Sequence, residues 1–155
     1  MGASRPAALA AVAWGGLAAG VLDTFLAMGQ FGVSAIVVYQ SVAAGLLGRE
    51  SYQGGLGTAA LGMFLHFFIA TTAAAVYVSA SRRLKLLVRW AVPCGLAFGM
   101  AVYFFMRHLV LPLSAARVGT FAWTGLIGHA LLVGLPIALF ARRACSTSGL
   151  DAPSA

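Results

Sequence analysis

Apolar residues run along this chain in long stretches, and short polar segments between them carry most of the charge. A helix needs about 20 consecutive apolar residues to cross a bilayer core of about 30 Å. Four stretches meet this length, and a hydropathy window places them at about 7–28, 55–80, 90–112 and 119–141. The pattern therefore predicts an all-α integral membrane protein with four transmembrane helices.

A fifth apolar stretch, at about 33–48, could be another span or a helix outside the spans, and the distribution of basic residues distinguishes the two. With four spans, one side of the membrane holds seven of the ten basic residues and the other side holds three, namely Arg49, Arg107 and Arg117. A fifth span would move the group from Arg82 to Arg89 to the outer side. Because basic residues favour the cytoplasmic side, we expect 33–48 to form an interfacial or re-entrant helix on the outer side. The seven residues of the basic side are Arg5, Arg82, Arg83, Lys85, Arg89, Arg142 and Arg143.

Composition also supports a membrane protein, and the placement of charge indicates where it lies. The chain is 61% hydrophobic and 8% charged, whereas soluble domains carry about 25% charged residues. The net charge of +7 sits beside apolar runs, which indicates membrane anchoring and not nucleic-acid binding. We expect a multi-pass protein of the bacterial inner (cytoplasmic) membrane with both termini cytoplasmic. Residues 1–144 would form one transmembrane bundle, and 145–155 a disordered cytoplasmic tail.

The two halves of the chain resemble each other. GLAAGVLDTF, at 16–25, aligns without a gap with GLAFGMAVYF, at 95–104, and GTAALGMFLH, at 57–66, aligns with GTFAWTGLIGH, at 119–129. These matches predict two parallel helical-hairpin repeats. Small residues let membrane helices approach closely, so the shared glycines predict helix packing at Gly16, Gly20, Gly62, Gly95, Gly99 and Gly125.

Five polar side chains within or near the spans are candidate functional residues, because ionisable groups in a membrane are costly and often functional. Helical spacing from Gly16 and Gly20 places Asp23 on their small-residue face. A purely structural Asp23 would bond Thr58 or Gln40, and structural histidines would bond backbone carbonyls or hydroxyls such as Thr71 and Thr124. The five candidates are Asp23, His66, Arg107, His108 and His129.

Three functions fit these residues. The small-residue faces and the small size favour a non-catalytic accessory or structural subunit of a larger membrane complex, or a homo-oligomer, whose partners are the bilayer and other membrane subunits. The alternative is a small oligomeric proton, ion or solute transporter that uses the intramembrane Asp and His. The third is a haem b or metal protein with His66 and His129 as ligands; otherwise we expect neither cofactor nor metal. The chain shows none of the usual catalytic motifs, so we do not expect an enzyme.

About half of the chain bears a loose family resemblance. GHALLVGLPIALFARR, at 128–143, is similar to the last helix of the YagU-like family of uncharacterised small bacterial inner-membrane proteins. QSVAAGLLGRE and the following GGLGTAALGMFLHF also look like small bacterial membrane proteins. The resemblance implies a small multi-pass membrane protein and no particular activity.

Overall fold

The first long helix shows how the sequence sets the ends of an element. The computed structural model describes residues 4–115 and 122–147. Helix α1 (Arg5–Phe31) begins at Ser4, whose Oγ accepts a hydrogen bond from the Ala7 N–H at 3.4 Å, and Pro6 lies in its first turn. It ends at Gly32, whose left-handed φ of 64° suits a residue without a side chain. The chain then turns into α2.

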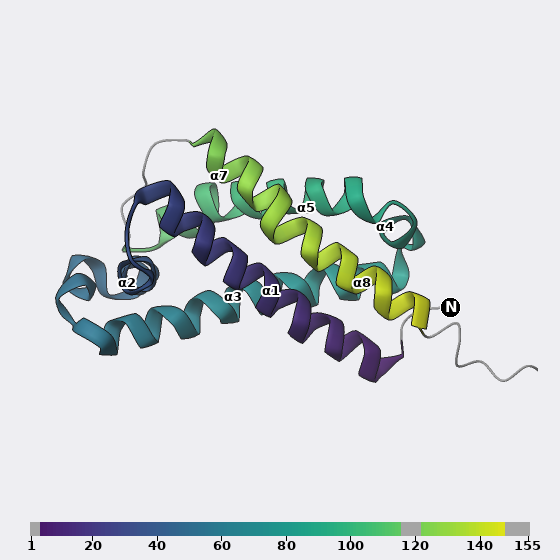
Figure 1. The fold of residues 1–155 in the computed structure, drawn as a ribbon, viewed down its shortest axis with the longest axis horizontal. Helices are drawn as coiled ribbons and strands as arrows, with labels where there is room; N and C mark the ends of the chain where they lie inside the picture. The colour runs from purple at the N-terminus through teal and green to yellow at the C-terminus, as the bar shows by residue number, and fades with distance from the viewer. Residues whose placement is uncertain (1–3, 116–121, 148–155) are drawn as a thin grey trace, which may run out of the picture.

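Helix α2 (Ala35–Leu47) has 13 residues, too few to cross a membrane. A 3₁₀ helix, η1 (Gly48–Gln53), joins it to the second long helix, α3 (Gly55–Arg83). Gln40 on α2 donates to the Gly55 carbonyl at 3.0 Å, and Gly62 on α3 packs against the Tyr39 carbonyl. α2 therefore lies across the end of the bundle, where it is seen end-on in Figure 1.

The second half of the chain forms two further long helices, and each contains a π-helical turn. A short helix, α4 (Lys85–Arg89), precedes α5 (Ala91–Phe105), which continues through the π-helical turn η2 (Met106–Val110) into α6 (Leu111–Leu113). The last helix comprises α7 (Trp123–Gly128), the π-helical turn η3 (His129–Gly134) and α8 (Leu135–Thr147). π-helical turns often mark functional sites.

Four helices among the described residues are long and apolar enough to cross a membrane, which confirms the predicted fold class. They span Arg5–Phe31, Gly55–Arg83, Ala91–Leu113 and Trp123–Ser146. The predicted start of the last span, 119, lies outside the described residues. The last helix continues past Arg142 and Arg143 to Thr147, so residues 145–147 of the predicted disordered tail are helical. Hydropathy marks the apolar part of a helix, while arginine and alanine also favour helix and extend it.

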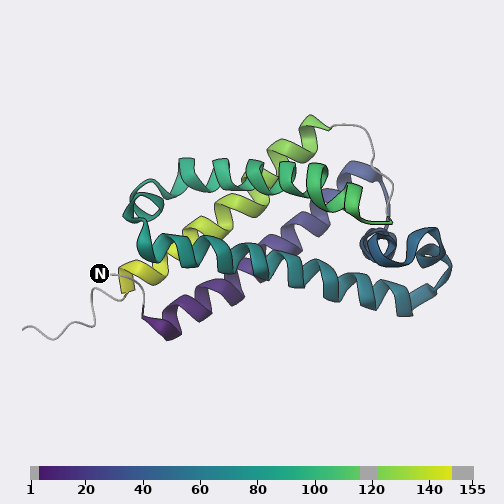
Figure 2. The same cartoon turned by 180° about the vertical axis from the view of Figure 1, so that it is seen from behind.

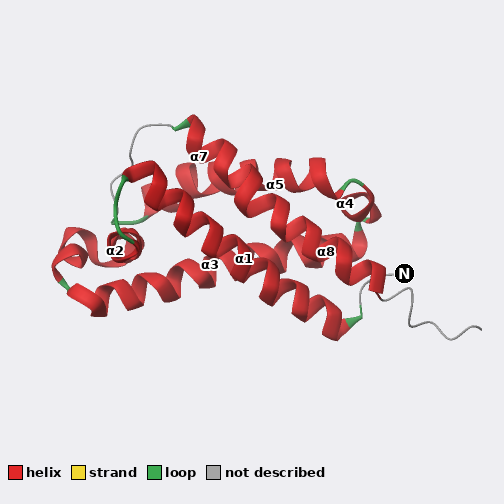
Figure 3. Cartoon of the chain, in the orientation of Figure 1, coloured by secondary structure: helices red, strands yellow, loops and turns green. Residues whose placement is uncertain are grey.

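The long helices lie in two layers that cross each other. In Figure 1, α1 and α8 lie in front of α3 and α5, and Figure 2 shows the same arrangement from behind. α1 packs against both α3 and α8, whereas α3 and α5 hardly approach each other along the described backbone and meet mainly through Tyr77 and Phe98, whose ring centroids lie 5.0 Å apart. Figure 3 shows the helices in red, joined by short green loops.

Small side chains fill the core where α1, α3 and α8 meet. Ala19, Ala74, Ile137, Ala138 and Ala141 are completely buried. At Gly16 the helices approach so closely that a Cβ atom would lie 2.7 Å from the Thr71 Cα atom. Such close backbone packing holds membrane helices together where lipid supplies no hydrophobic drive. This core occupies the end of the bundle that holds the start of α1, the end of α8, and α4.

Candidate functional site

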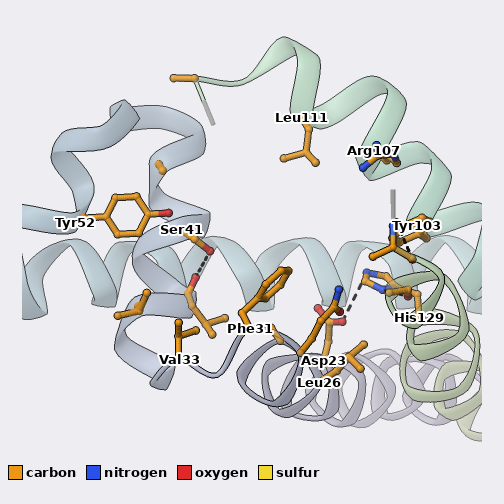
Figure 4. A pocket seen from close by; sticks show the side chains of 18 of the residues that line it. Asp23, Leu26, Phe31, Val33, Ser41, Tyr52, Tyr103, Arg107, Leu111 and His129 are labelled. Atoms are coloured by element: carbon orange, nitrogen blue, oxygen red, sulfur yellow. Dashed lines mark hydrogen bonds and ion pairs between the residues drawn. The ribbon is translucent and has the colours of Figure 1, made fainter. Parts of the chain in front are cut away.

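A cavity of about 640 Å³ lies at the opposite end of the bundle. Its walls come from the C-terminal half of α1, from α2 and η1, from the end of the α5–η2–α6 helix, and from α7 (Figure 4). The volume falls in the range of pockets that bind small molecules, roughly 300–1,000 Å³. The cavity exists because α2 and the long helices meet around it without filling it.

Asp23 and His129 lie together in this cavity. The Asp23 Oδ1 atom is 3.6 Å from the His129 Nε2 atom, and the two side chains are 22% and 21% exposed (Figure 4). Asp23 projects from α1, and His129 begins the π-helical turn η3. The two residues are far apart in sequence and come together because α1 packs against the whole length of the last helix.

The contact of the His129 Nδ1 atom with a backbone carbonyl determines which ring nitrogen carries the proton. The Nδ1 atom lies 2.9 Å from the Gly125 carbonyl oxygen. A carbonyl only accepts hydrogen bonds, so we assign the proton of the neutral ring to Nδ1. Nε2 then presents a lone pair to the Asp23 carboxyl group. The two atoms lie 3.6 Å apart, a contact that becomes an ion pair only when the imidazole also carries a proton on Nε2.

His66 belongs to a separate cluster on another side of α1. Its Nε2 atom lies 2.9 Å from the Gly20 carbonyl oxygen, which also accepts a hydrogen bond from the Thr24 hydroxyl at 2.8 Å. Thr24 Oγ1 is 3.3 Å from both His66 Nε2 and the Tyr39 hydroxyl. The neighbours Asp23 and Thr24 therefore contact different histidines, one from each flanking helix.

Helix α1 presents small residues to two neighbouring helices. Gly16 and Gly20 face Thr71 and Phe67 of α3, whereas Gly15 faces Ile137 and Phe140 of α8. Asp23, seven residues after Gly16, contacts His129 of the last helix, so it lies where the face toward α3 borders the face toward the last helix. α1 has two small-residue faces because it is packed between two helices. Spacing from one glycine pair could not tell these faces apart.

The partners found differ from those suggested for a structural role. Thr58 donates to the Ser51 carbonyl at 2.6 Å and Gln40 to the Gly55 carbonyl, so neither is the contact found for Asp23. The histidines bond carbonyls, as was considered, but the hydroxyl close to His66 is that of Thr24. Gln40 of α2 and Thr58 of α3 instead donate hydrogen bonds to backbone carbonyls in the connection between these two helices.

The remaining sequence candidates divide between the cavity and the outer surface. Arg107 lines the cavity from η2, one turn after Tyr103, whose ring centroid lies 5.3 Å from that of His129. His108 is exposed, and its ring stacks on Phe104 with centroids 5.9 Å apart. The structure therefore brings Asp23, Arg107 and His129 to one site. His66 and His108 lie elsewhere.

The packing glycines all face neighbouring segments. Gly16 and Gly20 face α3, and Gly62 faces α2. A Cβ atom at Gly95 would lie 2.7 Å from the Ala138 Cβ atom, and one at Gly99 would lie 2.7 Å from the Ala130 Cα atom. Gly125 faces the Tyr103 ring, 2.9 Å from a Cβ position. The internal repeat stays a prediction.

A bis-histidine haem site would need both imidazoles directed at one iron. Here the His66 Nε2 atom is directed at the Gly20 carbonyl and the His129 Nε2 atom at Asp23. Both rings would have to leave these partners, and haem binding stays a prediction.

Sequence reasoning missed several polar residues of the cavity. Arg49 entered only as a loop charge, and the others were not singled out. Helical spacing carried one usable signal, because Leu26, Ala27 and Gln30 follow Asp23 on one face of α1. No such signal links α2 and η1 to α5. The missed polar lining residues are Gln30, Ser41, Arg49, Tyr52 and Tyr103.

No protein-family model, curated protein or solved structure matches this chain. The resemblance to YagU-like proteins therefore stays a prediction, and function is inferred from the geometry of the site.

Proposed function

We propose that the protein is a proton-linked transporter of a small solute in a bacterial cytoplasmic membrane, with both chain ends on the cytoplasmic side. The observation that carries this proposal is the position of the Asp23–His129 pair in the wall of a cavity, at the end of the bundle opposite α4 and the arginines at the ends of α3 and α8. A solute that enters from the outer side reaches the cavity and the proton site together.

The energetic cost of placing the ionisable Asp23–His129 pair within membrane spans supports a functional role for it. A carboxyl group and an imidazole within membrane spans are expensive, and such groups commonly mark proton and solute pathways. Imidazole changes its charge near neutral pH, which suits proton exchange. The pair also adjoins two π-helical turns, one of which begins at His129 itself. Local irregularity is therefore concentrated where the ionisable groups meet.

Tight packing closes the bundle on the other side of the pair. Ala19 lies one turn before Asp23 on α1, and Val133 and Ile137 lie one and two turns after His129. All three are buried in the core. The arrangement fits a transporter open to the outer side, in which alternating access requires these helices to separate.

The accessory-subunit function was favoured by the small size of the chain and by the small-residue faces, which offer packing surfaces to other subunits. In the structure these faces pack within the chain, Gly16 against Thr71 and Gly95 against Ala138. Partner subunits stay a prediction, but the glycines do not require them.

Proton binding can be measured without knowing the solute. Proteoliposomes on a solid-supported membrane would be stepped from about pH 8 to about pH 6, a range that spans imidazole titration. We expect a transient displacement current in the wild type, because a proton enters the low-dielectric interior. The current should be lost in Asp23→Asn and His129→Gln.

The chain offers a matched control for each variant. Glu50→Gln makes the same change of acid to amide on exposed η1, and His108→Gln replaces the exposed histidine. Both should keep the wild-type current. An undiminished current in Asp23→Asn would overturn the proposed function.

A further inference from the structure

The charged groups of the cavity are mostly positive. Among the described residues that line it, the charged side chains are Asp23, Arg49 and Arg107, with His129 as a titratable fourth. Asp23 is next to His129, whereas the two arginines come from η1 and η2 on separate walls. When the Asp23–His129 pair holds its proton it is neutral overall, and the two guanidinium groups then set the charge of the cavity.

The rest of the lining is largely apolar. Leu26, Phe31, Val33, Val37, Val38 and Leu111 contribute aliphatic and aromatic surface. Burying apolar surface is favourable, at roughly 25 cal/mol per Å². The cavity is thus suited to a molecule with an apolar body, and its arginines are suited to a carboxylate, which a guanidinium binds with two parallel hydrogen bonds.

We infer that the cavity binds an organic monoanion, a carboxylate on a small apolar body, and takes up one proton with it. This inference rests on the proposed function and names the solute class. Arg107, which lines the same cavity as the Asp23–His129 pair, is the cationic residue assigned to the carboxylate, and Arg49 adds positive charge at the exposed rim.

The proton linkage follows from charge. The groups around the Asp23–His129 pair are Tyr103 and Arg107 on the third span, with Arg49 and Tyr52 across the cavity. Phenol and guanidinium groups ordinarily keep their charge between about pH 5 and 8. The unprotonated pair carries one negative charge that repels a carboxylate. Protonation removes it, and by reciprocity the bound anion favours protonation.

The test uses benzoate as the probe, with the full-length protein in nanodiscs of neutral phosphatidylcholine. We expect benzoate to bind more tightly at about pH 6 than at about pH 8, by up to about tenfold per pH unit for one linked proton. Benzylamine, a cation of similar shape, should bind much more weakly. Preference for benzylamine would overturn the inference.

Variants separate the anion site from the proton site. Arg107→Gln should weaken benzoate binding by about tenfold or more, since a charge-assisted contact is lost. Arg107→Lys keeps the charge and should bind with intermediate affinity, which keeps the test informative if the glutamine variant does not fold. Asp23→Asn should bind benzoate at about pH 8 as the wild type does at about pH 6, without pH dependence. Glu50→Gln should match the wild type, and unchanged binding in Arg107→Gln would overturn the assignment.

The outcomes distinguish the two proposals. If the wild type gives the proton displacement current but binds no benzoate, the solute class is wrong and the proposed function stands. If benzoate binds without pH dependence and no current appears, the proton linkage and the proposed function both fail. Adding anionic phosphatidylglycerol to the nanodiscs should not compete with benzoate. Competition would show that a lipid headgroup occupies the site and would overturn the inference.

Discussion

Two adjacent residues of α1 contact two different histidines. Asp23 contacts His129 of the last helix, and Thr24 lies within 3.3 Å of the His66 Nε2 atom on α3. Consecutive residues on a helix point about 100° apart, so neighbours can serve different interfaces. His129 is 21% exposed and faces the cavity, whereas the His66 Nε2 atom lies beside the Gly20 carbonyl and the Thr24 hydroxyl. The proposed function therefore gives the two histidines different roles.

Replacing each histidine should show this difference. In His66→Gln we expect a loss of about 1 kcal/mol in stability, because one hydrogen bond to Gly20 is lost while Thr24 still donates to the same carbonyl. The proton displacement current should persist. In His129→Gln the current should disappear with little loss of stability. Thermal unfolding in detergent and the current measurement together check this, and loss of the current in His66→Gln would contradict it.

At the scale of elements, close contacts between helix backbones determine the arrangement. α1 meets α3 at Gly16, and α5 meets the last helix at Gly95, Gly99 and Gly134. The sequence indicated that glycines at these spacings would pack. It could not indicate which helix each one meets, because a small-residue face accepts any partner that approaches closely enough.

Two glycines of α1 offer a matched comparison. Gly16→Ala would place a Cβ atom 2.7 Å from the Thr71 Cα atom, so we expect a loss of about 1–3 kcal/mol from overpacking. Gly29→Ala meets nothing within 4 Å, so it should be neutral or gain at most about 1 kcal/mol from helix propensity. Thermal unfolding of the two variants provides the measurement. Equal stability would show that α1 and α3 are not in contact at Gly16.

The sequence predicted the classes of element well and their assembly poorly. Long apolar runs indicated the spans directly, and the basic residues placed 33–48 outside them. The cavity was not predictable, because its walls come from α1, α2, η1, α5 and α7, and no local pattern encodes their meeting. The contact between Asp23 and His129 joins the first helix to the last. Such a contact is decided by packing over the whole bundle.

At the scale of the whole molecule, the main feature is that the two ends of the bundle differ. One end holds the start of α1, the end of α8, α4 and a core of buried alanines, and the other holds a cavity with two arginines and the Asp23–His129 pair. In the proposed transporter, the packed end closes the path while the cavity receives the solute from the other side. A proton site at the boundary between these two regions is placed to link solute binding to the opening of the closed end.

The most direct test of the central claim, that Asp23 and His129 share one exchangeable proton, is ¹⁵N NMR of the histidine side chains across about pH 5 to 9, a range that spans imidazole titration. His66→Gln and His108→Gln assign the His129 signals. We predict that the His129 Nδ1 atom stays protonated throughout, and that the Nε2 signal changes with pH and shifts in Asp23→Asn. A neutral His129 protonated at Nε2, with a signal unaffected by Asp23→Asn, would contradict the claim.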